Sequence, residues 1–158
     1  MEGFIAYARK DRAMLDGLLE RLDPDMRKGI GPKYWADPAI EGGQKWNKKI
    51  EAAIERAEVF LLLVSPGFLF SDYIYRIELP AIRARAARCD GLVVPVLVEK
   101  CMWEQHLAEY DNHAVPTIGP WLKAIRDCRP QRDGFHEAHV QLCAAVKAFK
   151  TDRRGSVP

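Results

Sequence analysis

Two uninterrupted apolar segments, residues 59–64 (VFLLLV) and 92–98 (LVVPVLV), limit the folds open to this chain more than any other feature. A strand with one face in water alternates apolar and polar side chains, whereas neither segment contains a polar residue. Runs this short and this apolar are typical of strands that helices cover on both faces, as in parallel sheets. The chain is therefore expected to pack helices on both sides of a mostly parallel sheet.

The rest of the sequence alternates between strand-like and helix-like patterns. Short apolar runs bounded by turn residues indicate strands, and apolar residues spaced by three or four indicate helices with one buried face. In order, the expected elements are a strand at 3–7, a helix with Leu15, Leu18, Leu19 and Leu22 inward, a strand at 33–35, a helix with Trp46, Ile50, Ala53, Ile54 and Ala57 inward, a strand at 59–64, a helix at 71–88 interrupted by Pro80, a strand at 92–98, a short edge strand at 121–125 and a helix at 134–149. This order predicts an α/β fold, a three-layer doubly wound sandwich with a five-stranded parallel sheet.

Length and composition suffice for one globular core. With 158 residues, 48% of them hydrophobic, we expect one domain at 1–150 and a polar C-terminal tail or the start of a linker at 151–158. No apolar run approaches the ~18 residues of a membrane span, and the first residues lack the apolar core of a signal peptide. The net charge of +2 is spread along the chain. A cytoplasmic protein is expected, with neither a membrane nor direct nucleic acid among its partners.

The cysteines and histidines give no metal or nucleophile motif at this stage. The four cysteines are spaced 12, 27 and 15 residues apart, without a CxxC pair, and no histidine was expected at ligand spacing from any of them. Reduced thiols and no bound metal are expected. The histidines fall in the C-terminal third with no nucleophile motif beside them, so they are assigned no catalysis.

Ligands of doubly wound sheets bind beyond the carboxyl ends of the strands, where the strand order reverses. Four segments of this chain are expected at that edge because each follows a predicted strand. They are residues 7–9, 35–45, 65–71 and 99–103.

Four segments in order resemble TIR (Toll/interleukin receptor/resistance) domains of the bacterial type. FIAYARKDR at 4–12 is similar to the opening strand and turn of the family, and YWADPAIEGGQKWNKKIEAAI at 34–54 is similar to its BB loop and the following helix. VFLLLVSPGFLFSDYIYRIELP at 59–80 and VVPVLVEKCMWE at 93–104 complete the resemblance. The likeness covers residues 4–150 and implies the flavodoxin-like TIR fold.

Two positions depart from the family pattern. Ala6 stands where the family commonly has serine, which removes a hydroxyl near the expected ligand. Receptor-type members have an aromatic residue four places before the family's glutamate, which corresponds here to Glu78. That place is Ile74 in this chain, with Tyr73 and Tyr75 on either side.

The resemblance implies an enzyme that cleaves the bond between nicotinamide and ribose in NAD+, with Glu78 as the catalytic carboxylate. NAD+ is then the substrate, and no further cofactor is expected. One carboxylate suffices for this chemistry because neutral nicotinamide leaves without a general acid, and the carboxylate stabilises the oxocarbenium-like ribose. Hydrolysis and cyclisation remain equally open.

The local sequence agrees with a special position for Glu78. Ser71 lies seven residues earlier, two helical turns away, and Ile74 and Tyr75 are expected on the same helix face. Pro80 lacks an N–H and should kink or restart the helix close to Glu78. The alternative is an ordinary exposed helix carboxylate, as most glutamates are.

Further residues are expected to bind the substrate, although each also has a purely structural interpretation. They are Tyr7, Ala8, Arg9, Asp37, Trp46, Phe68, Ser71 and Tyr75. The turn after the first strand and the start of the Ser71 helix are expected to hold the diphosphate through N–H groups and Arg9, and Asp37 to accept hydrogen bonds from a ribose. The alternatives are a surface cation for Arg9, a turn residue for Asp37, and core packing for Trp46 and Phe68.

The glycine pair in the second strand-to-helix loop suggests an assembly surface. Adjacent glycines permit several backbone conformations, and the resemblance implies that this loop contacts a neighbouring copy through Ile40, Gly42, Gly43 and Lys45. The expected partners are other TIR domains in an oligomer or filament, together with a sensor domain outside this chain, in a bacterial immune (antiphage) effector. Two alternatives stay open, a non-catalytic TIR scaffold and a nucleoside-transferase-like enzyme.

Overall fold

The computed structural model of the chain describes residues 1–37 and 44–155, with side chains from residue 47 onward in the second segment. Four parallel strands form the main sheet in the order β2-β1-β3-β4. Their bounds are Glu2–Ala6 for β1, Lys33–Ala36 for β2, Val59–Val64 for β3 and Leu92–Leu97 for β4. The expected doubly wound α/β architecture is confirmed, because the strand order reverses between β1 and β3.

The prediction of a fifth strand in this sheet, at residues 121–125, is wrong. Residues 117–118 (β5, Thr117–Ile118) and 121–122 (β6, Trp121–Leu122) pair with each other as a separate antiparallel hairpin. At the edge of β4, Val115 makes a single bridge, donating to the Pro95 carbonyl at 2.9 Å and accepting from Leu97 N–H at 2.8 Å. Pro116 follows and has no N–H to donate, so the ladder stops after one residue.

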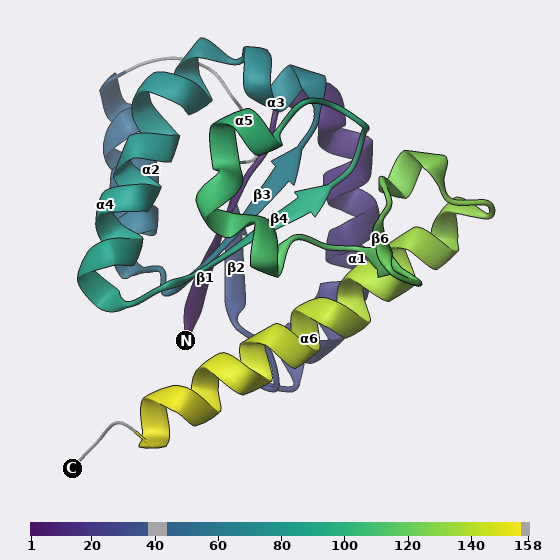
Figure 1. Cartoon of the computed structure of the whole chain (residues 1–158). Helices are drawn as coiled ribbons and strands as arrows, with labels where there is room; N and C mark the ends of the chain where they lie inside the picture. Colours follow the sequence, from purple (N-terminus) through teal and green to yellow (C-terminus); the bar gives the residue numbers. More distant parts are fainter. Residues whose placement is uncertain (38–43, 156–158) are drawn as a thin grey trace.

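The continuously apolar strands are buried on both faces, as predicted. Alternate residues of β3 enter different cores, with Phe60 and Leu62 on one side and Leu61 and Leu63 on the other. The first core lies under α2 (Gln44–Arg56) and α4 (Leu79–Cys89), and the second under α1 (Arg12–Arg27) and α6 (Gln131–Gly155). Figure 1 shows these helix pairs on opposite sides of the sheet.

The helix expected at 71–88 has a more complex form. A short helix α3 (Pro66–Phe70) follows β3, and after Ser71 a π-helical turn η2 (Ile74–Glu78) leads into α4. Leu79 N–H donates to the Ile74 carbonyl, five residues back, in place of the usual four. The irregularity expected from Pro80 is therefore a π turn that ends at Glu78.

Short elements complete the chain. They are η1 (Arg9–Asp11), α5 (Glu104–Leu107), η3 (Ala108–His113) and η4 (Ile125–Asp127). Helix α6 continues to Gly155, so the first residues assigned to a polar tail are helical. Across the described segments, every helix is too short or too polar to cross a bilayer.

Gly134 lies where α6 packs closely against the loop before it. A Cβ at this position would lie 2.7 Å from Cys128 Sγ and 3.2 Å from the Ile125 Cα, whereas nothing lies within 4 Å of a Cβ at Gly155 in the same helix. We expect Gly134→Ala to lower the free energy of unfolding by roughly 1–2 kcal/mol, since overpacking outweighs the helix propensity gained. Chemical denaturation should show no loss for the control Gly155→Ala. Equal stability of the two variants would contradict this packing.

Candidate active site around Glu78

Glu78 is a buried carboxylic acid at the end of the π turn. Only 6% of the residue is exposed, and its Oε2 has no hydrogen-bond partner among the described residues. Buried polar atoms are nearly always paired, and leaving one unpaired costs roughly 1–3 kcal/mol. The exposed-carboxylate alternative is therefore wrong, and the unpaired oxygen makes Glu78 a candidate for a functional role.

Burial, followed by the charge of Asp37, raises the pKa of Glu78 to about 8. Both causes disfavour the ionised form, because the carboxylate loses hydration and faces a second negative charge. The free protein thus holds Glu78 largely protonated at pH 7. A cation bound beside it would favour ionisation.

Asp37 and Tyr7 come together at the carboxyl edge of the sheet. Asp37 follows β2 and is 5% exposed, and Tyr7 follows β1 and is equally buried. The Tyr7 hydroxyl donates a hydrogen bond to the main-chain carbonyl of Asp37. This bond joins the ends of two neighbouring strands and holds Asp37 close enough for its charge to act on Glu78.

Tyr73 is the aromatic residue that the structure associates with Glu78. Its hydroxyl donates to Asn47 Oδ1 of α2 at 3.0 Å, and burial together with the charge of Glu78 raises the Tyr73 pKa to about 12. Tyr75, by contrast, is 59% exposed and does not share the buried face of Glu78. The wider turn of the π helix accounts for the difference, because it keeps Ile74 beside Glu78 and rotates Tyr75 outward.

Ser71 fixes the start of the helical segment that carries Glu78. Its hydroxyl oxygen accepts a hydrogen bond from Ile74 N–H at 3.3 Å, and its carbonyl accepts from Tyr75 N–H at 3.0 Å. This is the capping role that serine commonly has at a helix start. Ser71 is half-buried and therefore positions the π turn whether or not it also meets a ligand.

Of the other residues expected to bind the substrate, some are buried in the core and one is exposed to solvent. Phe68 is 2% exposed and packs into the core under α2 and α4, Ala8 is buried, and Arg9 is exposed on η1. Several expected residues lie outside the described part of the chain, either entirely or by their side chains. These are Ile40, Gly42, Gly43, Lys45 and Trp46.

Sequence reasoning gave no role to a polar cluster beneath the same edge. Asp11 is 2% exposed, accepts a hydrogen bond from the Ser65 hydroxyl, and lies 3.5 Å from Arg126 Nη2. The Ser65 oxygen also accepts from Phe68 N–H at 3.0 Å and so caps α3. Asp11 stood in the family-like turn, and serine before Pro66 is a typical helix start, so both carried a detectable signal.

Comparison with known proteins agrees with this architecture. Residues 4–125 match a family model described as a TIR domain. The chain is also 31% identical over 160 residues to the uncharacterized protein y4lF of Sinorhizobium fredii. That alignment covers 98% of this chain and 46% of the relative, so the chain spans about half the length of the relative it matches.

The unpaired carboxyl predicts a pH-dependent effect of Glu78→Gln on stability. The pKa of Glu78 is about 8 in the folded protein, against an ordinary value of 4.5. Its stabilising contribution is therefore complete below about pH 4.5 and is lost as the pH rises towards 8, because the unfolded chain releases the proton first. Glutamine cannot ionise. We expect the variant to gain roughly 3 kcal/mol on wild type between pH 5 and pH 8, at about 1.4 kcal/mol per pKa unit.

Thermal unfolding at both pH values, with Glu51→Gln on the exposed surface of α2 as control, measures this effect. The control should keep a constant offset from wild type. A constant offset for Glu78→Gln as well would show that its carboxyl ionises normally in the folded chain.

Proposed function

This chain belongs to the TIR domain family, and from that premise we propose that it cleaves the nicotinamide–ribose bond of NAD+ with Glu78 as the catalytic carboxylate. The observation that carries the proposal is the buried Glu78 carboxyl, which lacks a hydrogen-bond partner among the described residues. It lies at the carboxyl edge of a doubly wound sheet, where ligands of such folds bind. A buried acid with a strongly raised pKa in that place is a functional-site candidate on physical grounds.

The chemistry matches the charge state of this group. Nicotinamide in NAD+ is a cationic pyridinium, and its departure as a neutral molecule leaves positive charge on the ribose. An ionised Glu78 would stabilise that charge in a site that excludes water, where electrostatic interactions are strongest. Attack by water gives ADP-ribose, and attack by an adenine nitrogen gives a cyclic product.

The neighbouring residues suit the rest of the substrate. Asp37, whose charge acts on Glu78, is proposed to accept hydrogen bonds from a ribose, and Tyr73 offers an aromatic ring beside Glu78. The turn at residues 7–9, with exposed Arg9, is proposed to hold the diphosphate. Ser71 is assigned the positioning of the π turn.

We further propose that the active form is a cytoplasmic assembly of TIR domains. The segment at 40–45 is assigned to contacts between copies, and a sensor domain is assigned to sequence outside this chain. The greater length of the matched relative is consistent with such a larger protein. An effector of bacterial immunity would use this arrangement to release NAD+ cleavage only after a trigger brings copies together.

Glu78→Gln tests the catalytic role. We expect it to reduce nicotinamide release at least about 100-fold, because glutamine keeps the shape of the residue without its charge. Release is measured by chromatography on the wild type, Glu78→Gln and the exposed control Glu51→Gln, which should keep full activity. Turnover of Glu78→Gln within about tenfold of wild type would remove the residue from the mechanism. No release by the assembled wild type would favour a non-catalytic scaffold, and consumption of nucleosides in place of NAD+ would favour a nucleoside transferase.

The pH profile separates charge from shape in the same experiment. Because the free enzyme must lose a proton from Glu78, kcat/KM should rise with pH through about 8. In the complex, the pyridinium charge lowers the Glu78 pKa, so kcat should reach its plateau at lower pH. Identical profiles for both constants would contradict this role of the substrate charge.

Activity should also depend on protein concentration. If neighbouring copies complete the site, specific activity rises with concentration or tethering, because the population of the assembled state limits the rate. The measurement is NAD+ cleavage across a hundredfold dilution series, together with mass determination of the species present. Constant specific activity from a monomer at every dilution would contradict assembly-dependent catalysis.

A further inference from the structure

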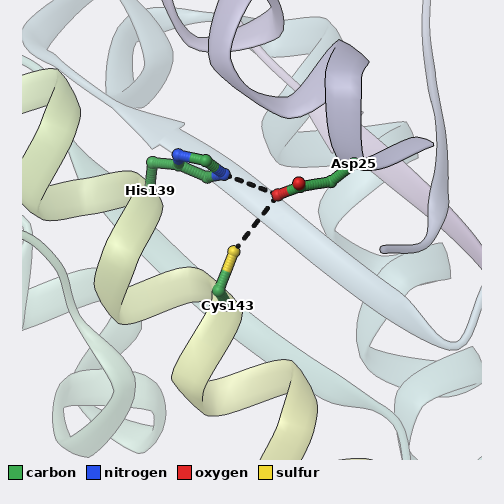
Figure 2. Close-up of side chains that lie close together, drawn as sticks. All are labelled: Asp25, His139 and Cys143. Carbon is green, nitrogen blue, oxygen red and sulfur yellow. Dashed lines mark hydrogen bonds and ion pairs between the residues drawn. The ribbon is translucent and has the colours of Figure 1, made fainter. Parts of the chain in front are cut away.

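Three potential ligand atoms meet between α1 and α6, on the face of the sheet opposite to α2 and α4. Asp25 extends from α1 toward His139 and Cys143 on α6 (Figure 2). The His139 Nε2 lies 2.7 Å from Asp25 Oδ2, and the Cys143 thiol donates to the same oxygen at 3.5 Å. We name these three residues the Asp–His–Cys cluster.

The expectation that no histidine lies at ligand spacing from a cysteine is wrong. His139 and Cys143 are four residues apart, and α6 brings positions four apart onto one face. Asp25, which completes the cluster, lies 114 positions before His139 in the sequence. Only the packing of α1 against α6 brings the carboxylate to the pair.

We propose that the Asp–His–Cys cluster binds a divalent transition-metal ion of the zinc class and joins α1 to α6. Carboxylate oxygen, imidazole nitrogen and thiolate sulfur together form a donor set that zinc accepts. Magnesium and calcium prefer oxygen ligands alone, so a site with nitrogen and sulfur disfavours them. Three protein ligands leave the fourth tetrahedral position to water.

The distances fit a tetrahedral ion with small side-chain rotations. The three ligand atoms all lie within 4.8 Å of one another. Zinc bonds of about 2.0–2.3 Å place tetrahedral ligand atoms about 3.3–3.8 Å apart. Of the two separations from Asp25 Oδ2, the 3.5 Å to Cys143 lies within that range and the 2.7 Å to His139 lies below it, so the imidazole has to move away from the carboxylate to admit the ion.

Accessibility and proton balance are also suitable. Asp25 and His139 keep about a quarter of their side chains exposed, Cys143 is exposed, and a groove of about 240 Å³ borders Asp25 and Cys143. Binding would use the Asp25 carboxylate, neutral His139 and the Cys143 thiolate. The thiol proton leaves for solvent as the metal–sulfur bond forms, and the proton that His139 Nε2 directs at Asp25 moves to Nδ1 or leaves as well, so that the Nε2 lone pair can reach the metal.

The arrangement of the three side chains does not fit a catalytic triad with a cysteine nucleophile. Such a triad needs the thiol against the imidazole and the carboxylate behind the imidazole. Here Asp25 lies in the middle, and both His139 and Cys143 contact its Oδ2. Convergence of two side chains on one oxygen suits a shared cation better than proton relay from sulfur to nitrogen.

Cobalt and zinc titrations of the metal-free chain test the site. With Co²⁺, we expect one equivalent to bind and a thiolate-to-cobalt charge-transfer band to appear in the near ultraviolet. With Zn²⁺ at a hundredfold excess over its Kd, the Tm should rise by roughly 5–10 °C. Cys143→Ser should abolish the band, and His139→Ala and Asp25→Asn should each weaken Zn²⁺ binding at least tenfold.

Matched controls separate this site from adventitious binding. His136→Ala on the same helix, where the histidine is exposed, and Cys101→Ser should keep the wild-type band and affinity. The proposal is overturned if wild type shows no thiolate band, or if its Zn²⁺ affinity survives both His139→Ala and Cys143→Ser. The band is measured on wild type, so it decides the matter even if a variant unfolds. Neither readout uses NAD+, so the result is independent of the function proposed for Glu78.

Discussion

Asp11 is 2% exposed at the carboxyl edge of the sheet, and side chains from two distant parts of the chain contact its carboxylate. The Ser65 hydroxyl reaches it from the end of β3, and Arg126 approaches from the segment after β4. The main-chain N–H of Arg126 also donates to the Val98 carbonyl at 3.0 Å, and its side-chain Nε lies 3.3 Å from Glu99 Oε2. Removal of either partner would leave the buried Asp11 carboxyl with fewer hydrogen bonds, which destabilises a polar group in such a place. The carboxyl edge of the sheet is therefore held by a contact that joins distant parts of the chain.

Two serine helix caps connect Asp11 to the helical segment that carries Glu78. Ser65 binds Asp11 and caps α3, and Ser71 then caps the helical segment that contains Glu78. The two buried carboxyl groups end in opposite situations. Asp11 contacts Ser65 and Arg126, whereas Glu78 Oε2 has no hydrogen-bond partner among the described residues. The pKa of Glu78 is raised accordingly. Their environments thus separate one group that stabilises the edge from one with the raised pKa that the proposed catalysis would use.

Much of the fold could be predicted from the sequence, because local patterns determine it. The run VFLLLV at 59–64 coincides with β3 at both ends, since a strand covered on both faces is recognisable from its continuous apolar sequence. The edge strand expected at 121–125 does not join the main sheet, because residues 121–122 pair with 117–118 in a hairpin of their own. The site was less predictable, since a π turn placed Tyr75, expected on the face of Glu78, in solvent, and long-range contacts assembled the other clusters. Asp11 meets Ser65 across 54 positions, a separation that no local spacing reveals.

The raised pKa of Glu78 is compatible with catalysis because the substrate would supply the missing charge. With a pKa of about 8, ionising the group at pH 7 costs about 1.4 kcal/mol, the value of one pKa unit. A cation at about 4 Å contributes on the order of 4 kcal/mol at the effective dielectric of protein sites. The attraction exceeds the cost, so a pyridinium placed beside Glu78 would ionise it. A neutral ligand of the same shape would leave the acid protonated, and the site would then discriminate NAD+ from its reduced form by charge.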